Sequence, residues 1–227
     1  LDRYLTRDVQ EHGTKAIRLA VADVVTSTPT KALSGDSLAA IEATRPERGV
    51  LDRVLVDLGR GQPGVPTRTG AELAFLVALA LDAGPGESVH DATCGECEVL
   101  LQVARLAAGR GDELGPLTGY DTDPDARRIG AARLALAGVA AELVEPAEES
   151  VDCLVFDPGL DSDVPDSATW QRTLRRGGRA ALVTRIRPDQ LDLLDAFPPC
   201  RIVLPPQRAA TALGVAAIWV GVRGPDR

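Results

Sequence analysis

From residue 88 onward, short apolar runs alternate with longer segments whose apolar residues recur at every third or fourth position. The short runs predict buried strands, and the longer periodic segments predict amphipathic helices. The expected strands cover residues 88–93, 117–121, 140–144, 151–156, 179–186, 200–204 and 214–222. The expected helices between them cover residues 98–108, 123–137, 167–175 and 189–196. This order predicts an α/β fold with a doubly wound, mostly parallel sheet of seven strands. No full helix separates the last two strands, so we expect them to form an antiparallel hairpin at the edge of the sheet.

The first part of the chain has a different pattern. Residues 1–58 carry apolar side chains near helical spacing and predict a small helical segment. Residues 59–70 are rich in glycine and proline and predict a linker, after which residues 71–81 predict one more helix. We therefore expect two parts, a helical N-terminal segment over residues 1–58 and an α/β domain over residues 59–227.

The composition is typical of a chain that folds around one core in water. With 227 residues, of which 44% are hydrophobic, the chain is long enough to bury a sizeable core. It has no run of 18 or more apolar residues and no charged-then-apolar leader, so we expect a soluble protein. Four cysteines are too few for a disulfide scaffold at this length, which favours the cytoplasm. The sequence begins at Leu1 and contains no methionine, which indicates a trimmed or incomplete N-terminus.

The net charge of -8 argues against a protein that binds nucleic acid over its whole surface. Six arginines nevertheless fall in one short span, which we expect to lie beside the carboxyl end of strand 151–156. They are Arg172, Arg175, Arg176, Arg179, Arg185 and Arg187. Such a cluster either meets phosphates or forms a solvated helix end and turn, and the sequence leaves both interpretations open.

Residues 89–97 form the most informative segment, because an apolar strand ends there in a turn of small residues that a helix follows. In α/β folds such a turn points backbone N–H groups at a ligand near the carboxyl edge of the sheet. Strand 117–121 ends in Asp121, an acid placed to accept hydrogen bonds from a ribose, and strand 151–156 is followed by Asp157. Three strands with polar residues at their carboxyl ends predict a nucleoside-type cofactor site.

Two cysteines in this turn introduce other kinds of chemistry. The C-G-E-C spacing of Cys94 and Cys97 at a helix start resembles a dithiol redox motif. A metal site built from all four cysteines would need a second closely spaced pair, which the sequence does not supply, so we expect no metal. We expect His12 and His90 to be structural, because no Ser-His-Asp arrangement can be recognised.

In this order the motifs resemble those of class I S-adenosylmethionine-dependent methyltransferases. More narrowly, they resemble the N6-adenine DNA methylases related to the modification subunits of type I restriction-modification systems. The family's D-P-x-C-G-S-G pattern is matched by residues 91–97, and its G-x-D-x-D-P pattern by residues 119–124. Residues 66–69 match its threonine-containing turn, and residues 201–220 look like its closing hairpin. The resemblance covers about residues 60–223 and implies a Rossmann-like sheet that binds S-adenosyl-L-methionine.

The resemblance also implies which residues hold the cofactor. Asp121 would contact its ribose and Asp91 its amino-acid end, while Asp157 stands at the reactive end. The full set of implied cofactor contacts is Thr67, Asp91, Ala92, Thr93, Cys94, Gly95, Asp121, Thr122 and Asp157. Each acid has an alternative role: Asp121 as a helix N-cap partner, Asp91 as a brace of the turn, and Asp157 as an inert carboxylate at a strand end.

In the adenine methylases a four-residue N/D-P-P-aromatic motif holds the target amino group and stacks on the flipped base. Here the motif is Asp157-Pro158-Gly159-Leu160. It keeps Asp157 and Pro158 as implied catalytic residues but lacks the second proline and the aromatic ring. Loss of a base–aromatic stack costs about 1–3 kcal/mol. In the first motif Cys97 replaces a glycine, and we expect its side chain to crowd the methionine part of the cofactor.

Three functions remain open at this point. The resemblance favours an N6-adenine DNA methylase of the restriction-modification type, with weak activity, that binds DNA and works with a separate specificity or partner subunit. The departures from the motif leave room for a non-catalytic cofactor-binding or accessory protein of the same fold, or for a methyltransferase with a different substrate. We expect no membrane partner, no metal, and a location in the cytoplasm.

Overall fold

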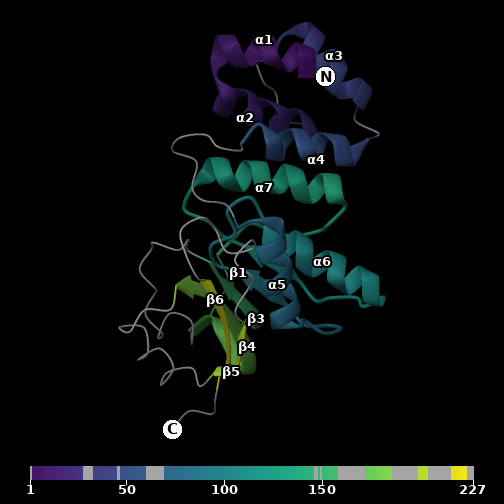
Figure 1. Cartoon of the computed structure of the whole chain (residues 1–227). Helices are drawn as coiled ribbons and strands as arrows, with labels where there is room; N and C mark the ends of the chain where they lie inside the picture. The colour runs from purple at the N-terminus through teal and green to yellow at the C-terminus, as the bar shows by residue number, and fades with distance from the viewer. Residues whose placement is uncertain are drawn as a thin grey trace. The chain divides into compact units, whose positions relative to one another are not determined.

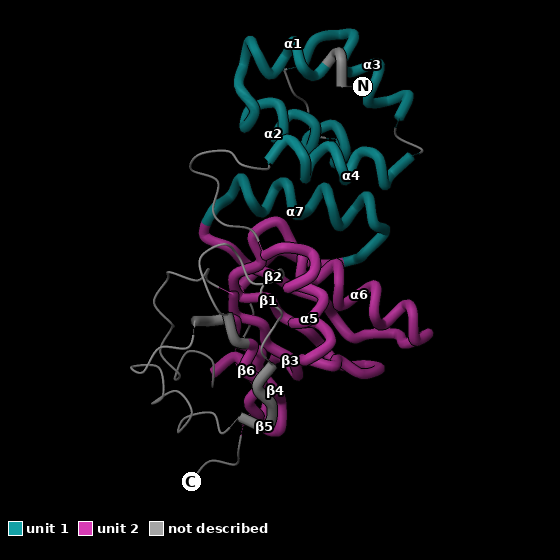
Figure 2. Tube along the Cα trace, in the orientation of Figure 1, with its two compact units in different colours: residues 1–66, 123–140 teal, residues 67–122, 141–227 magenta. Residues whose placement is uncertain are grey.

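The computed structural model describes residues 2–27, 33–44, 47–59, 69–145, 148, 150–157, 172–185, 199–203 and 216–223. The chain divides into two compact units, which Figure 2 distinguishes by colour. The first unit comprises Leu1–Pro66 and Asp123–Ala140, and the second comprises Thr67–Thr122 and Ala141–Arg227.

The described part of the first unit is helical. It consists of α1 (Asp2–His12), α2 (Thr14–Val25), α3 (Gly35–Thr44), α4 (Arg48–Asp57) and α7 (Pro124–Ala137) (Figure 1). The helices expected within residues 1–58 are thus present. Their core contains Leu51 and Leu55 of α4, and α7 adds Ile129 and Leu136 to it. The boundary expected at residue 58 stays a prediction, and the sequence did not indicate that α7 shares the N-terminal core.

Ion pairs fix α7 against the other helices of this unit. Arg133 of α7, whose side chain is only 4% exposed, donates a hydrogen bond to Asp52 of α4 over 2.8 Å. Both carboxylate oxygens of Asp23 in α2 accept a hydrogen bond from the guanidinium of Arg128 in α7, over 2.6 and 2.7 Å. Arg133 is buried, so removing Asp52 would leave an uncompensated buried charge, whereas the Arg128 side chain is 47% exposed and its pair contributes less.

The second unit contains a mixed sheet. Its described strands are β1 (Val89–Asp91), β2 (Leu117–Gly119), β3 (Val151–Phe156), β4 (Leu174–Arg185), β5 (Pro199–Val203) and β6 (Ala216–Val222). They lie in the order β2-β1-β3-β4-β6-β5. Strands β1 to β4 pair in parallel, whereas β6 is antiparallel to both β4 and β5. The mostly parallel sheet and the antiparallel C-terminal pair are therefore confirmed, with β5 at the edge.

A seventh strand is not confirmed within the described residues. The segment 140–144, expected as a strand, makes a single parallel bridge between Glu142 and Thr118. Each residue of this segment is exposed or half-exposed. Because none of these side chains is fully buried, little packing stabilises a longer ladder against β2, and the pairing ends at one bridge.

Two helices of the second unit match their expected positions. Helix α5 (Ala71–Leu81) agrees with the expected 71–81, and α6 (Glu98–Arg110) extends the expected 98–108 by two residues. They pack against each other, and α6 also contacts β1 (Figure 1). None of the described helices is long and apolar enough to cross a membrane.

The start of β4 differs from the prediction. A helix over residues 167–175 and a strand from residue 179 were expected, but the strand already begins at Leu174, which is fully buried opposite Val151. The register then shifts, because four residues of β4 but only one of β3 lie between this pair and the next, Cys153 with Arg179. Gly177 has a φ of 75°, which allows this bulge. Of the expected helix, residues 172–173 are helical. Residues 167–171 and the helix expected over 189–196 lie outside the described residues.

Candidate cofactor and acceptor site

The carboxyl ends of three neighbouring strands meet at one edge of the sheet. Asp91 at the end of β1 is in register with Gly119 of β2 and Val155 of β3. The backbone hydrogen bonds continue for one more residue beyond these pairs. Tyr120 N–H donates to the Asp91 carbonyl, and Ala92 N–H donates to the Val155 carbonyl, both over 2.9 Å. The acids that directly end or follow these strands therefore share one edge, as the sequence predicts. We call Asp91, Asp121 and Asp157 the acidic edge.

Asp91 is almost completely buried, with 1% of its surface exposed. Its Oδ1 accepts a hydrogen bond from the Thr93 N–H over 3.2 Å, so it braces the turn after β1. The pKa of this carboxyl is raised to about 8, mainly by burial and also by the charges of Asp157 and Asp121, against the lowering effect of the Thr93 hydrogen bond. A cation beside such a buried acid would favour loss of its proton, and the resulting carboxylate would then stabilise the cation.

Asp121 is bonded to the same turn from the next strand. Its Oδ2 accepts a hydrogen bond from the Gly95 N–H over 2.9 Å. The alternative role of Asp121 as the helix cap falls to another residue, since Asp123 is the N-cap of α7 and accepts from Asp125 N–H over 2.9 Å. Thr122, between them, is exposed.

Gly95 leaves open space at this turn. Its φ of 49° lies in the left-handed region, and a Cβ built on it would meet no atom within 4 Å. Gly119 is closely packed instead, since a Cβ there would lie 3.0 Å from the side chains of Cys94 and Leu100. The turn is thus anchored to β2 on one side and open beside Gly95, which is where a ligand can approach the backbone.

Asp157 is held at two points. Its N–H donates a hydrogen bond to Thr93 Oγ1 over 2.7 Å, and its Oδ2 accepts a hydrogen bond from Thr69 Oγ1. The sequence prediction had taken Thr67 from the turn before α5, and Thr67 lies outside the described residues, as do Pro158, Gly159 and Leu160. A signal for Thr69 was present in the sequence, because it too belongs to the threonine-containing turn.

The cysteines do not form a reactive pair. Cys94, Cys97 and Cys153 are buried free thiols. The pKa of Cys94 is raised, first by its hydrogen bond with Cys97 and then by burial. Redox-active thiols need a lowered pKa and access to solvent, so this environment disfavours the dithiol alternative. The described residues contain no group of three or more metal-ligating side chains, and the side chain of Cys200 is not among those described.

Cys97 is buried at the end of the turn, and its expected crowding of the methionine part of the cofactor stays a prediction. It precedes α6 with a φ of 62° and has no exposed surface. Its side chain is therefore enclosed within the protein, where it contacts Cys94. The replacement of glycine here places a non-glycine residue in the left-handed region, which costs about 1–2 kcal/mol.

His90 has the structural role that we expected. It is buried in β1, and its Nδ1 lies 2.8 Å from Thr118 Oγ1. Burial lowers the pKa of His90 to about 4, so the ring is neutral near pH 7.

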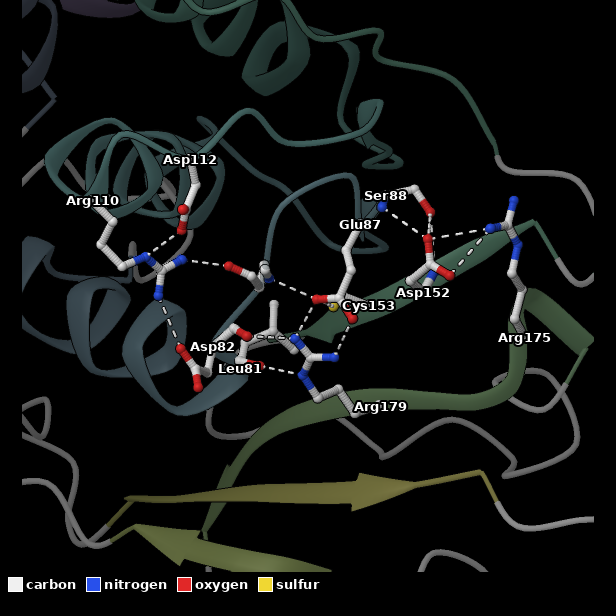
Figure 3. A network of polar contacts seen from close by, with 12 residues as sticks. Leu81, Asp82, Glu87, Ser88, Arg110, Asp112, Asp152, Cys153, Arg175 and Arg179 are labelled. Carbon is white, nitrogen blue, oxygen red and sulfur yellow. Dashed lines mark hydrogen bonds and ion pairs between the residues drawn. The ribbon is translucent and has the colours of Figure 1, made fainter.

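Two of the six arginines lie near the amino ends of the strands, whereas the acidic edge is at their carboxyl ends. This corrects the expected position of these two arginines beside the carboxyl end of strand 151–156. Because β4 runs parallel to β3, Arg175 and Arg179 stand near the amino ends of the strands. Arg175 pairs with Asp152 over 3.1 Å, and Arg179 makes two contacts with Glu87 over 2.8 and 2.6 Å (Figure 3). These two side chains are therefore engaged in ion pairs within the protein.

Of the other four arginines, Arg172 and Arg176 have described side chains, and both are exposed. Arg172 pairs at 3.9 Å with Glu148, and both side chains are exposed. Arg185 is the last residue of β4 and so lies at the carboxyl end of the strands, as the acidic edge does, but its side chain is not among those described. Arg187 lies outside the described residues.

Comparisons with known proteins agree with this geometry. No protein-family model and no curated protein sequence matches the chain. A protein of Listeria monocytogenes, assigned as a class I S-adenosylmethionine-dependent methyltransferase, is similar in structure with a TM-score of 0.72 at 15% identity. That match covers 98% of this chain and 84% of the other. The resemblance to class I methyltransferases that the sequence predicts is thus confirmed for the fold.

Two further structures bear on the finer predictions. A modification subunit assigned to a type I restriction enzyme of Vibrio vulnificus matches with a TM-score of 0.61 at 16% identity, over 84% of this chain and 53% of that one. The TYW2 protein of Pyrococcus horikoshii, in complex with MeSAdo, matches with a TM-score of 0.52 at 13% identity, over 70% of this chain and 66% of that one. The chain therefore spans about half of the modification subunit. At these identities the likeness shows the fold.

Proposed function

We propose that this chain is an S-adenosylmethionine-dependent methyltransferase. The observation that carries the proposal is the acidic edge, where Asp91, Asp121 and Asp157 converge on the open turn at Gly95. In parallel α/β sheets, ligands bind outside the carboxyl ends of the strands. The similar fold of methyltransferases from other organisms supports the same conclusion.

The residues present suit this cofactor. S-adenosylmethionine carries positive charge on its amino group and its sulfonium, and a buried carboxyl such as Asp91 can balance a cation. Asp121 keeps acceptor capacity for a ribose beside its bond to Gly95, since a carboxylate has about four acceptor sites. Ala92, Thr93, Cys94, Thr122 and, from the sequence, Thr67 would complete the contacts. When bound, the cofactor supplies a methyl group attached to sulfur as the electrophile.

The chain's own contribution to transfer would be orientation. Asp157, fixed through its N–H by Thr93, would accept a hydrogen bond from the amino group of the acceptor. The Pro158 carbonyl would accept a second one. Two acceptors at defined positions direct the nitrogen lone pair at the methyl group, and such positioning lowers the barrier by avoiding a search for the reactive geometry.

For the acceptor, we propose the N6 amino group of adenine in DNA, with a separate subunit supplying sequence recognition. The motif at Asp157 and the similarity to a modification subunit support this assignment. A specific observation favours a second candidate: Leu160 replaces the ring that would stack on a base. A non-catalytic cofactor-binding protein, or a methyltransferase for another amine, fits that replacement. A cytoplasmic location also remains part of the proposal.

A methyl-transfer assay tests the proposal. The full chain is incubated with radiolabelled S-adenosylmethionine and unmethylated genomic DNA. We expect weak incorporation that Asp157→Ala abolishes while cofactor affinity stays nearly unchanged, and that Glu113→Gln, an exposed acid at the other end of the sheet, leaves intact. The double change Gly159→Pro with Leu160→Phe should raise incorporation if the missing stack limits the reaction. Silence from both the wild type and this double variant contradicts DNA methylation.

A further inference from the structure

We propose that Thr69 is the residue that positions the Asp157 carboxylate for its acceptor. The inference rests on the proposed methyltransferase function and deepens it, because it names a second side chain that the reaction depends on. Its basis is the hydrogen bond from Thr69 Oγ1 to Asp157 Oδ2, which joins residues 88 positions apart in the chain.

The placement of Thr69 indicates that its hydroxyl serves Asp157 and not the helix next to it. A threonine at the N-cap position of a helix accepts a hydrogen bond from one of the first free backbone N–H groups. The N-cap of α5 is Gly70, which has no side chain to make this bond, and Thr69 stands one residue before it. The hydroxyl of Thr69 instead reaches the residue after β3. The start of α5 therefore goes without a side-chain cap while Asp157 gains a donor.

The contact completes a chain of hydrogen bonds across the site. Asp91 accepts from the Thr93 N–H over 3.2 Å, and Thr93 Oγ1 accepts from the Asp157 N–H over 2.7 Å. Thr93 thereby fixes the backbone of Asp157 but not the rotation of its side chain. Thr69 bonds the carboxylate itself, so it limits that rotation.

This arrangement leaves Asp157 able to act on an acceptor. A hydroxyl donates one proton, whereas a carboxylate has about four acceptor sites on its two oxygens. An amine can therefore donate to the carboxylate while Thr69 stays bonded to Oδ2. Thr69 touches neither acceptor nor cofactor in this scheme, and its effect reaches the reaction only through the orientation of Asp157.

The first test compares Thr69→Val with Thr69→Ser in the full chain. Valine keeps the shape of threonine and removes the hydroxyl, and serine keeps the hydroxyl. We expect Thr69→Val to lower kcat by about tenfold or more, because misplacing a catalytic group reduces the rate steeply. The KM for the acceptor and the Kd for S-adenosylmethionine should change by less than about threefold, and serine should restore kcat. A rise in Kd or KM at unchanged kcat, or no rescue by serine, overturns the positioning role.

The second test needs no activity. A double-mutant cycle combines Thr69→Val with Asp157→Ala, which removes the acceptor, and follows urea unfolding of the four proteins without ligand. If the two side chains are bonded, the unfolding equilibrium constants deviate from additivity by about fivefold. Additive effects overturn the contact and the inference with it. A wild type that binds no cofactor and transfers no methyl group refutes the proposed function instead, and the cycle then still decides whether Thr69 holds Asp157.

Discussion

The backbone N–H of Gly95 donates a hydrogen bond to Asp121 Oδ2 over 2.9 Å, so the acid after β2 is bonded to the turn after β1. This contact gives Asp121 a structural role, because it ties the turn to the end of β2. Under the proposed function the same carboxylate would also accept a hydrogen bond from the ribose of the cofactor. The shape of the turn and the acceptor at its rim therefore depend on each other.

Asp91 gives the fold a characteristic pH dependence. Its pKa is raised from 3.8 to about 8 in the folded protein. Between these values the unfolded chain carries the ionised acid while the folded protein keeps the proton, so stability from this group falls as pH rises from about 4 to about 8. Asp91→Asn cannot ionise and should become more stable relative to the wild type as pH rises through this window. Urea unfolding of both proteins at pH 5, 6.5 and 8 measures the effect.

The control for this comparison is Glu113→Gln, which removes an exposed acid in the same unit. Its stability relative to the wild type should vary much less between pH 5 and pH 8. A constant difference between Asp91→Asn and the wild type over this range would show that Asp91 is not buried as described.

Arg179 should be a strong determinant of stability in the second unit. It bonds both carboxylate oxygens of Glu87 and the carbonyls of Leu81 and Asp82 at the end of α5 (Figure 3). Arg179→Gln should lower the free energy of unfolding by about 1.5–3 kcal/mol, the usual range for hydrogen bonds to charged groups. Urea unfolding at pH 7 checks this, with Arg105→Gln on the exposed face of α6 as the control.

The same variant should also change the response to acid. The hydrogen bond from Arg179 lowers the pKa of Glu87 from 4.5 to about 2. Stability from Glu87 is therefore fully present above pH 4.5 and lost as pH falls toward 2. Without Arg179 most of this contribution disappears, so the variant and the wild type should converge in stability near pH 2. A difference that stays constant down to that pH would contradict the assigned pairing.

The first unit should not fold without α7. Ile129 is 3% exposed in its core. Ile129→Ala should lower the free energy of unfolding by about 2–5 kcal/mol, because the cavity adds to the lost burial. Ala135→Ser, on the exposed face of the same helix, should have little effect. Circular dichroism of a fragment of residues 1–66 should show little stable helix, and a cooperative thermal transition in that fragment would refute the requirement for α7.

The acidic edge could be predicted from the sequence because its signals are local. Asp91, Asp121 and Asp157 each come at or just after the end of a short apolar run, and parallel pairing brings such ends to one edge. Thr69 could not be assigned in this way. Its contact with Asp157 depends on where α5 starts relative to β3, and no periodicity along the chain carries that information.

Two other differences have physical causes of the same kind. The apolar pattern of α7 shows which of its faces is buried but not which partner buries it, and its partner is the N-terminal core. At the start of β4, the sequence Arg-Arg-Gly-Gly does not predict a strand, because glycines are unfavourable in strands. In the structure this run forms a bulge, and Leu174 before it pairs with Val151. The position of Arg175 and Arg179 near the amino ends of the strands follows from the parallel pairing of β4 with β3.

Calorimetric titration with S-adenosylmethionine tests the central claim most directly. Wild-type protein should bind the cofactor with measurable heat. Asp121→Ala should weaken binding by about 1.5–3 kcal/mol, because a charged hydrogen bond to the ligand is lost and the Gly95 turn loses its anchor. Glu113→Gln should bind like the wild type. Absence of heat from well-folded wild-type protein at millimolar cofactor, or equal affinity of the wild type and Asp121→Ala, would contradict a cofactor site at the acidic edge.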